Sequence, residues 1–257
     1  MLHCHASSAR LACASLAHIA VSRAMTSPMR LTAAHVSLVH RDVADPGPSP
    51  GMDHFSDEDY ENHLGKFLSR RPTGPISVFC YGSLIWKPAF EPTAVRRATA
   101  LGWHRSFCLR IRRFRGTPEA PGLMMQIDRG GVCEGVIQEI AAGSELETLR
   151  SLWRREMTVK PPSNFPRWID VEVEGRQRRA IAFTANPESP IYAGGLSSDV
   201  VAECLGNACG HWGSGAEYLH QTIACLEREG IHDPYLWDLQ ERVALLIEQR
   251  FPEACLV

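Results

Sequence analysis

A single carboxylate inside an apolar helical stripe is the first feature of this sequence that could do chemistry. Residues 144–157 repeat with a helical period of about 100° per residue. Their large apolar side chains fall on one face of the expected helix: Leu146, Leu149, Leu152, Trp153 and Met157. Glu156 lies within that stripe, and burial raises the pKa of a carboxylate toward neutrality. Glu156 is therefore a candidate general acid and base. The alternative is that it pairs with a structural arginine or faces solvent at the helix end.

A second candidate is the turn that follows the apolar, strand-like residues 76–80. Its sequence is Tyr81-Gly82-Ser83-Leu84-Ile85. Gly82 permits backbone conformations that other residues avoid, and the N–H groups after it can form a concavity that binds an anion. The hydroxyls of Ser83 and Tyr81 add hydrogen-bonding groups. This set suits a ligand with an α-carboxylate and an amine; the alternative is an ordinary turn.

Two further features near these candidates have competing interpretations. Cys80 comes directly before the turn and is expected to be a core residue at the edge of the site rather than a nucleophile. The basic run Arg112, Arg113 and Arg115 is either a solvated turn or an attractor for a carboxylate of the substrate.

Composition excludes several function classes. The chain has 257 residues, a formal net charge of -2, 44% hydrophobic residues and 22% charged residues, which is typical of a globular protein. A near-neutral charge argues against nucleic acid as the main partner, and no apolar run reaches the ~18 residues of a membrane span. The nine cysteines form no C-x-x-C pair and fit no zinc module. They indicate free thiols, mostly buried, in a reducing compartment, which we take to be the cytoplasm.

The first 51 residues differ in composition from the rest. They contain arginine but no lysine or glutamate, and they end in a Pro- and Gly-rich run at 46–51. We therefore expect residues 1–51 to be a disordered extension or a transit-like segment. Residues 52–257 are expected to form the folded domain.

Hydrophobic periodicity predicts strands early in the chain and helices late. Runs bounded by Gly and Pro predict strands at 76–80, 103–111, 123–127, 132–140, 168–173 and 179–185. Helices are expected at 53–68, 144–157, 214–230 and 233–250. Ser144 and Ser214, each three residues before a glutamate, are expected to be N-caps. Asp233-Pro234 predicts an N-cap followed by a first-turn proline. Strands with one inserted helix, followed by helices, indicate an α+β fold.

Seven stretches keep their order along the chain and together resemble the ChaC family of γ-glutamylcyclotransferases, in its glutathione-specific branch. They are residues 78–88, 105–108, 115–123, 152–157, 192–194, 217–219 and 230–236. The most specific part is the combination of the Tyr-Gly-Ser-Leu turn with the run Arg-Arg-Glu-Met that contains Glu156. The resemblance covers roughly residues 76–245.

This resemblance implies a small mixed β-barrel flanked by helices, and a site in which the turn faces one catalytic glutamate, here Glu156. It implies substrate contacts from the residues of the turn and one later tyrosine: Cys80, Tyr81, Gly82, Ser83, Leu84, Ile85 and Tyr192. One departure concerns a family tyrosine that follows the glutamate and precedes Pro-Arg-Trp. Phe165 holds that place here, so one hydroxyl is missing.

The implied activity is that of a lyase that converts glutathione to 5-oxoproline and cysteinylglycine. The reaction needs no metal and no organic cofactor. The expected partner is the small molecule glutathione, without nucleic acid, a membrane or an obligate protein partner. Two alternatives stay open: a cyclotransferase acting on other γ-glutamyl amino acids or amines, and a non-catalytic regulator of transport proteins on the same fold.

Overall fold

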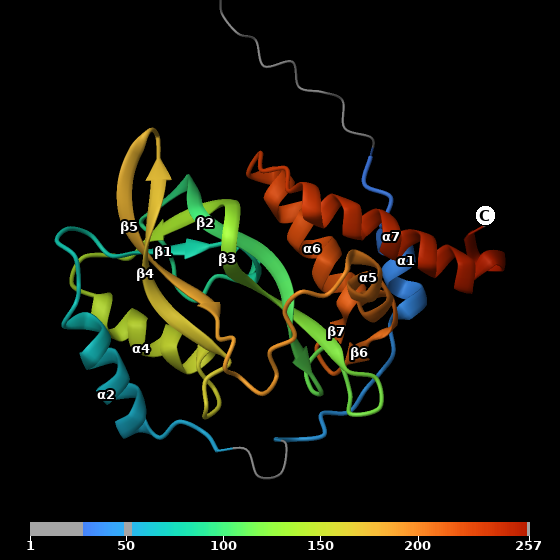
Figure 1. The fold of residues 1–257 in the computed structure, drawn as a ribbon, viewed down its shortest axis with the longest axis horizontal. Helices are drawn as coiled ribbons and strands as arrows, with labels where there is room; N and C mark the ends of the chain where they lie inside the picture. Colours follow the sequence, from blue (N-terminus) through green and yellow to red (C-terminus); the bar gives the residue numbers. More distant parts are fainter. Residues whose placement is uncertain (1–27, 49–52, 256–257) are drawn as a thin grey trace, which may run out of the picture.

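The computed structural model describes residues 28–48 and 53–255, in which five strands close into a barrel (Figure 1). The strands are β1 (Ser77–Cys80), β2 (Ala94–Ile111), β3 (Gly122–Glu139), β4 (Asn164–Val173) and β5 (Arg176–Ala185). They follow the order β1-β3-β2-β4-β5, and β5 completes the ring by pairing in parallel with β1 and β3. The predicted α+β barrel flanked by helices is confirmed.

The hairpin of β2 and β3 is longer than the sequence predicts. Each strand has 18 residues, and their pairing runs from Ala94–Glu139 to Ile111–Gly122. Gly102, Gly130 and Gly131 divide the apolar pattern, so the sequence indicates shorter strands. In the structure these glycines take φ values of 79°, 104° and 68° beside an irregularity in the register. Glycine adopts this left-handed region at little cost, so the hairpin bends there instead of ending.

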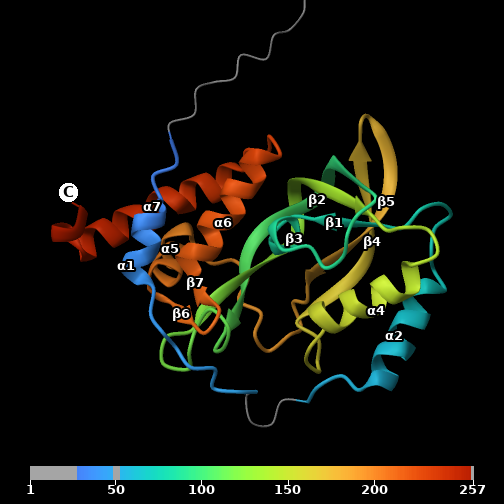
Figure 2. The ribbon, with the colours of Figure 1, turned by 180° about the vertical axis from the view of Figure 1, so that it is seen from behind.

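Helices cover two opposite sides of the barrel, as the views in Figures 1 and 2 agree. One side carries α2 (Asp57–Leu68) and α4 (Glu145–Glu156). The other side carries α1 (Ala33–Val39), α5 (Ser198–Asn207), α6 (Gly215–Arg228) and α7 (Pro234–Arg250), with the short pair β6 (Cys209–Gly210) and β7 (Gly213–Ser214). A 3-10 turn follows at Pro252–Cys255. The one-turn helix α3 (Ser83–Trp86), predicted as a loop, contacts β1 and α6.

All three predicted helix starts are confirmed, but only two of the three N-cap side chains form the expected hydrogen bond. The Ser214 hydroxyl accepts from Glu217 N at 3.0 Å, and Asp233 Oδ1 accepts from Leu236 N at 3.0 Å. Ser144 is the N-cap residue of α4, but its hydroxyl donates to Ala141 O at 3.0 Å instead of capping the helix. In the same first turn Leu146 is 46% exposed, because the buried face of α4 begins only at the next turn.

The N-terminal segment differs from the expected disordered extension over residues 28–48. Leu31 is fully buried and its N–H donates to Gln240 Oε1 on α7 at 2.8 Å. Arg30 pairs with Glu248 at 2.6 Å, and α1 follows with Thr32 as its N-cap. A helix of seven residues is too short to produce a clear periodic signal. Residues 1–27 and 49–51 lie outside the described part, so the expectation for them stays a prediction.

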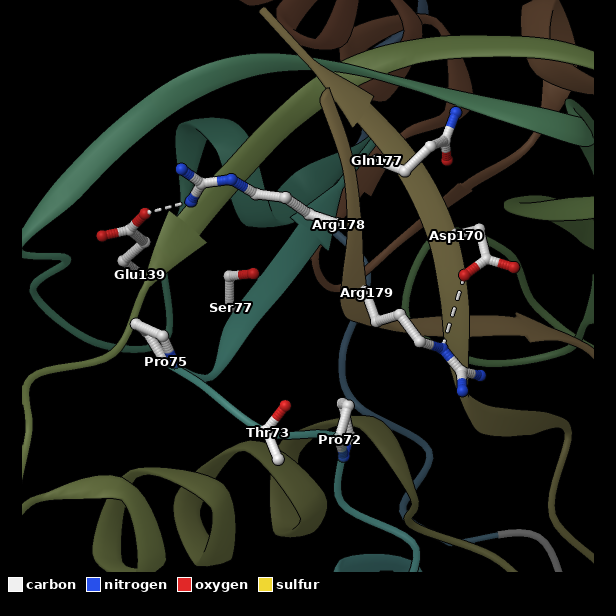
Figure 3. A pocket seen from close by; sticks show the side chains of 9 residues that line it. All are labelled: Pro72, Thr73, Pro75, Ser77, Glu139, Asp170, Gln177, Arg178 and Arg179. Atoms are coloured by element: carbon white, nitrogen blue, oxygen red, sulfur yellow. Dashed lines mark hydrogen bonds and ion pairs between the residues drawn. The ribbon is translucent and has the colours of Figure 1, made fainter. Parts of the chain in front are cut away.

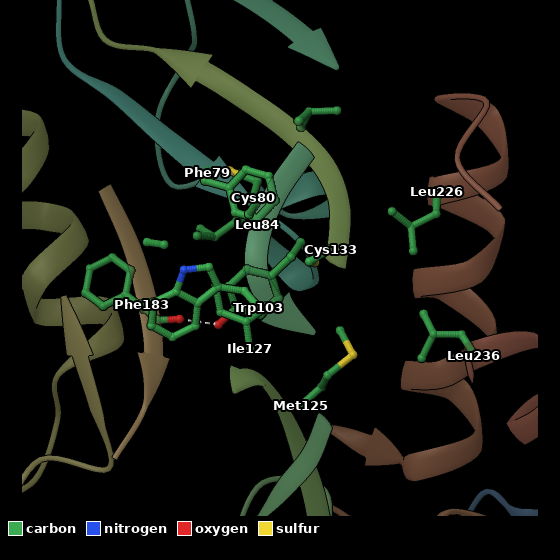
Figure 4. Close-up of a cluster of buried hydrophobic side chains, with 14 of the residues drawn as sticks. Phe79, Cys80, Leu84, Trp103, Met125, Ile127, Cys133, Phe183, Leu226 and Leu236 are labelled. Atoms are coloured by element: carbon green, nitrogen blue, oxygen red, sulfur yellow. Dashed lines mark hydrogen bonds between the residues drawn. The ribbon is translucent and has the colours of Figure 1, made fainter. Parts of the chain in front are cut away.

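One apolar cluster extends from the barrel to α6 and α7, and Figure 4 draws part of it. Phe79, Trp103, Ile127 and Phe183 belong to the barrel, and Met125 lies between them and the helical side. The described cysteines are free: Cys80, Cys108, Cys133, Cys209 and Cys225 are buried, and Cys204 is half-buried, in agreement with the sequence. Within the described ranges, no helix combines the length and the apolar character needed to cross a bilayer.

Candidate active site

Glu156 is the last residue of α4, where the apolar face of the helix meets the end of the barrel. Leu152 and Trp153 on the preceding turn are fully buried, whereas 18% of the Glu156 side chain stays exposed. Burial raises the pKa of Glu156, and the guanidinium of Arg155, 3.2 Å from Glu156 Oε1, opposes that shift only in part. The carboxylate is therefore poised to exchange a proton nearer neutrality than an exposed glutamate.

The backbone around Glu156 is held from two other elements. Asn164 at the start of β4 donates its Nδ2–H to Glu156 O at 2.9 Å. Tyr60 of α2 donates its hydroxyl to Met157 O at 2.8 Å. Because these bonds satisfy the last carbonyls of the helix, they fix the end of α4 and the direction in which the Glu156 side chain points.

The predicted turn follows β1 directly and continues into α3. The Tyr81 side chain points into the barrel, where its hydroxyl lies 2.6 Å from both Gln126 Oε1 and Phe183 O. Its phenol is thus hydrogen-bonded within the protein, and in the turn only Ser83 and Ile85 are half-buried rather than buried. Gln138 holds that backbone by donating to Leu84 O at 3.1 Å.

Arg105 of β2 holds the turn through its buried guanidinium. Its side chain is 1% exposed, and its Nε–H donates to Tyr81 O at 2.8 Å. One Nη donates to Glu134 O at 2.5 Å, and the other pairs with Asp233 Oδ2 at 2.6 Å. Asp233 also caps α7, so this one guanidinium joins the turn, the barrel and the helical side. The sequence placed residues 105–108 in the resemblance without indicating this role.

Gly82 is closely surrounded by side chains of other elements. Its φ of -149° is not left-handed, so the turn does not depend on a left-handed glycine. A Cβ at Gly82 would lie 3.1 Å from the hydroxyl of Tyr218 and 3.0 Å from Met125 Cε. Close packing of α6 against the turn therefore leaves little room for a side chain at this position.

Tyr218 is the site residue that sequence reasoning missed. It belongs to α6, is 3% exposed, and burial raises the pKa of its phenol to about 12. A hydrogen bond from the backbone of Ser83 and the nearby charges of Arg115 and Arg105 oppose that rise. The stretch 217–219 was part of the resemblance, but only the packing of α6 on α3 brings the hydroxyl to Gly82.

The negative charge of Glu156 affects the pKa of three residues in or beside the turn. It raises the pKa of the Cys80 thiol, of Tyr81 and of Tyr218, although burial is the larger cause in each case. A fully buried thiol with a raised pKa is a poor nucleophile, which agrees with the structural interpretation of Cys80. Furthermore, Arg155 donates to Lys87 O at 2.7 Å, directly after α3. The glutamate and the turn, 71 residues apart along the chain from Ile85 to Glu156, therefore lie in the same region of the fold and together make up the candidate site.

Comparison with known proteins agrees with this arrangement. A family model described as ChaC-like protein matches residues 76–246. The glutathione-specific γ-glutamylcyclotransferase of Escherichia coli (strain K12) is 35% identical over 204 residues, covering 79% of this chain and 87% of that protein. The chain belongs to the ChaC-like family.

Other relatives extend the comparison. Glutathione-specific γ-glutamylcyclotransferase 1 of Danio rerio is 28% identical over 173 residues, which cover 63% of this chain and 86% of that protein. The crystal structure of a yeast γ-glutamyl cyclotransferase specific to glutathione matches with a TM-score of 0.60 at 21% identity. It covers 66% of this chain and 96% of the yeast chain. At this identity the yeast structure supports the ChaC-like fold.

Other residues singled out from the sequence have partners of their own in the structure. The Tyr192 hydroxyl donates to Asp128 at 2.5 Å, and its backbone bridges Leu109 on the β2–β3 hairpin. Arg113 is paired with Asp45 through two hydrogen bonds of 2.7 and 2.6 Å. Arg115 is paired with Glu217 at 2.9 Å. The last two arginines are thus neutralised by the protein itself, which disfavours them as the attractor for a substrate carboxylate.

Two hollows of this ChaC-like chain are lined by residues other than the turn and Glu156. The larger, of about 520 Å³, lies at the barrel end shown in Figure 3, and it is lined by Pro72, Thr73, Pro75, Ser77, Glu139, Asp170, Gln177, Arg178 and Arg179. Its arginines pair with its acids, Arg178 with Glu139 and Arg179 with Asp170. The smaller, of about 340 Å³, lies between residues 40–44 and the β6–β7 pair. Among the described residues, no group of three His, Cys, Asp or Glu side chains is placed to hold a metal.

Proposed function

We infer that this protein is a γ-glutamylcyclotransferase that cleaves glutathione to 5-oxoproline and cysteinylglycine. The Escherichia coli and Danio rerio relatives carry this activity in their names, and the chain belongs to the same family. The observation that carries the mechanism is Glu156, a carboxylate whose pKa is raised by burial and whose charge reaches the turn after β1.

In this reaction the substrate supplies its own nucleophile. The α-amine nitrogen of the γ-glutamyl group bonds to the γ-carbonyl carbon, a five-membered lactam closes, and the bond from that carbon to the cysteine nitrogen breaks. Because both reacting groups belong to one molecule, holding them in near-attack geometry supplies a large part of the rate gain.

The proton is the obstacle that Glu156 removes. An α-amine has a pKa near ~8, so at neutral pH it is mainly an ammonium group and not nucleophilic. In the proposed mechanism the Glu156 carboxylate moves two protons in turn from this nitrogen to the leaving cysteine nitrogen. Loss of the first proton frees the lone pair that attacks, and the second leaves as the lactam nitrogen becomes an amide, so cysteinylglycine departs with an ammonium group. Glu156 ends in the state in which it began, and a raised pKa brings it closer to the pKa of the amine. The atoms and protons balance without a metal or an organic cofactor.

The turn is the proposed anchor for the γ-glutamyl end. Backbone N–H groups at the start of α3 would hold the α-carboxylate or the developing oxyanion, with the N–H of Ser83 first released from the Tyr218 hydroxyl, and the Ser83 hydroxyl would add one contact. Loss of one such donor costs ~3–4 kcal/mol of transition-state stabilisation in well-characterised hydrolases. Cys80, Leu84 and Ile85 would line this end of the site, and the proposed contact from Tyr192 would require substrate to reach the β2–β3 hairpin.

The direct test is to incubate the protein with glutathione and to measure 5-oxoproline and cysteinylglycine by mass spectrometry. A parallel assay with γ-glutamyl-alanine separates a glutathione-specific enzyme from a broader cyclotransferase. Phe165 makes this comparison informative, because its ring packs under the Arg167 guanidinium at 5.3 Å and offers no hydroxyl. Absence of 5-oxoproline with either substrate, together with co-purification of a partner protein, would instead favour a non-catalytic regulator.

A cytoplasmic location is part of the same proposal. Glutathione is kept reduced in that compartment, and the described thiols of the chain are free. We further propose that glutathione is the ligand of the protein and that turnover requires no protein partner, which activity of the purified chain would test.

A further inference from the structure

An exposed tryptophan and a lysine meet at one edge of the site. Trp212 lies in the turn between β6 and β7 and is 55% exposed. Its backbone N–H donates to Phe114 O at 2.8 Å, and its ring packs on that of Phe114 with centroids 4.3 Å apart. The Nζ of Lys87 lies over the indole, 5.8 Å from its centroid. The tryptophan is thus a fixed platform, and the lysine rests on it by a cation–π contact.

The backbone of Lys87 is tied directly to the proposed catalytic group. Lys87 ends α3, and its carbonyl accepts from Arg155 Nη1 at 2.7 Å, while Arg155 Nε lies 3.2 Å from Glu156 Oε1. The side chain of Lys87 then extends to Trp212. Lys87 therefore spans the region from the proposed reaction centre to the outer edge of the site.

The substrate extends two residues beyond the bond that is cut. An extended residue spans about 3.5 Å, so the glycine carboxylate of glutathione lies on the order of 7–10 Å from the γ-carbonyl carbon. A ligand held at the turn by its γ-glutamyl end would place its other carboxylate near the lysine.

Most other cations around the site already have acidic or carbonyl partners. Arg105 is buried against Asp233, and Arg115 is paired with Glu217. Arg155 is shared between Glu156 and Lys87 O. Within the described part of the chain, Lys87 has no carboxylate within 4.0 Å, so its charge is available to a ligand. Arg112 is exposed on the β2–β3 loop, where no contact in the described chain ties it to α3 or α4.

We propose that Lys87, supported by Trp212, binds the terminal glycine carboxylate of glutathione and so sets the preference of the enzyme for this tripeptide. The proposal rests on the proposed function. A charge-assisted hydrogen bond forms between the ammonium and the carboxylate, and the indole holds the lysine in place. Because the contact is partly exposed, we expect about a 3- to 10-fold effect on KM, which weakens as salt is added.

The test compares glutathione with its glycine monoethyl ester, which keeps the γ-glutamyl end and loses only the terminal charge. The wild-type enzyme is expected to have about a 3- to 10-fold lower KM for the free acid. In Lys87→Gln the two substrates should have equal KM values, with the loss in KM for the acid rather than in kcat. Lys87→Arg should retain the preference. Lys66→Gln is the matched control, because Lys66 is an exposed lysine on α2, away from this platform, and should behave as wild type.

Binding measurements separate this proposal from the proposed function. Calorimetric titration of Glu156→Gln with the acid and the ester reports the contact whether or not turnover occurs. Equal affinities there, an unchanged preference in Lys87→Gln, or loss of the preference in Arg112→Gln would overturn the assignment to Lys87. A protein that binds the acid better than the ester but forms no 5-oxoproline would support the carboxylate contact and contradict the proposed activity.

Discussion

Two carboxylates of this molecule each contact an arginine, and the two pairs are built differently. Asp233 Oδ2 lies 2.6 Å from Arg105, whose side chain is 1% exposed and which also binds two backbone carbonyls. Glu156 Oε1 lies 3.2 Å from Arg155, which is 27% exposed and donates its Nη1 to Lys87 O. The two carboxylates are similarly exposed, at 14% for Asp233 and 18% for Glu156, so the pairs differ in their arginines. Arg105 is buried and hydrogen-bonded through all its nitrogens, whereas Arg155 is part-exposed and lies farther from its carboxylate.

This difference indicates a structural role for Asp233 and a proton-transfer role for Glu156. A carboxylate that pairs with a buried guanidinium and caps a helix holds structure together, since its oxygens bond to two elements of the protein. A desolvated carboxylate with one long contact keeps a raised pKa, because the arginine compensates only part of the cost of burial. This raised pKa suits Glu156 to exchange a proton.

The largest expected effect is on activity. Glu156→Gln keeps the shape of the side chain and removes the base, so kcat should fall by ~10²–10⁴-fold. The assay is 5-oxoproline release from glutathione. Glu147→Gln changes an exposed glutamate on the same helix and should retain wild-type turnover. A loss of less than about tenfold in Glu156→Gln would contradict the assignment.

Asp233→Asn should break the ion pair between Asp233 and Arg105. Asparagine still caps α7, so the change isolates the ion pair and leaves Arg105 buried without its countercharge. We expect a loss of about 3–5 kcal/mol in the free energy of unfolding, measured by urea denaturation. Asp238→Asn is the control, because that residue pairs with Arg242 at the surface and should cost ~1 kcal/mol or less. Similar losses in the two variants would show that the Arg105–Asp233 pair stabilises the fold no more than a surface pair.

Gly82→Ala tests the turn that Arg105 holds through Tyr81 O. The new Cβ would press on Tyr218 and Met125, and overpacking of this kind costs ~1–3 kcal/mol. We expect the turn to shift away from α6 to relieve this contact. The change should therefore raise the KM for glutathione more than it lowers the free energy of unfolding. Gly65→Ala on α2, where a Cβ meets no atom within 4 Å, is the control. A normal KM in Gly82→Ala would argue against the turn as the ligand anchor.

The smallest expected effect is a pH dependence of stability. Because burial raises the pKa of Glu156 above its usual 4.5, the folded protein holds this proton more tightly than the unfolded chain. The ionised carboxylate therefore costs stability as pH rises through the folded pKa. Glu156→Gln should be more stable than wild type near neutral pH, and the advantage should vanish below about pH 4.5. Urea midpoints that differ equally at about pH 4 and about pH 7.5 would contradict this linkage.

Several features of the fold were predictable from local pattern. The strand at 77–80, the helices beginning at Ser214 and Asp233, and the burial of Leu149, Leu152 and Trp153 follow from apolar periodicity and caps. The pattern failed where tertiary packing overrides it. The segment 28–48 looked disordered, but Leu31 and Val39 find a surface on the helical side. Ser144 looked like a cap, but its hydroxyl binds Ala141 O instead.

The sequence determined on its own that one glutamate would stand in the apolar face of a helix, and that a glycine turn would follow a buried strand. Both properties depend on residue spacing, which is local. Tertiary packing alone brings the two features together, places Arg105 and Asp233 against the turn, and brings the Tyr218 hydroxyl of α6 close to position 82. These contacts join residues far apart along the chain, and their distances follow from barrel closure and helix packing, which no local pattern contains.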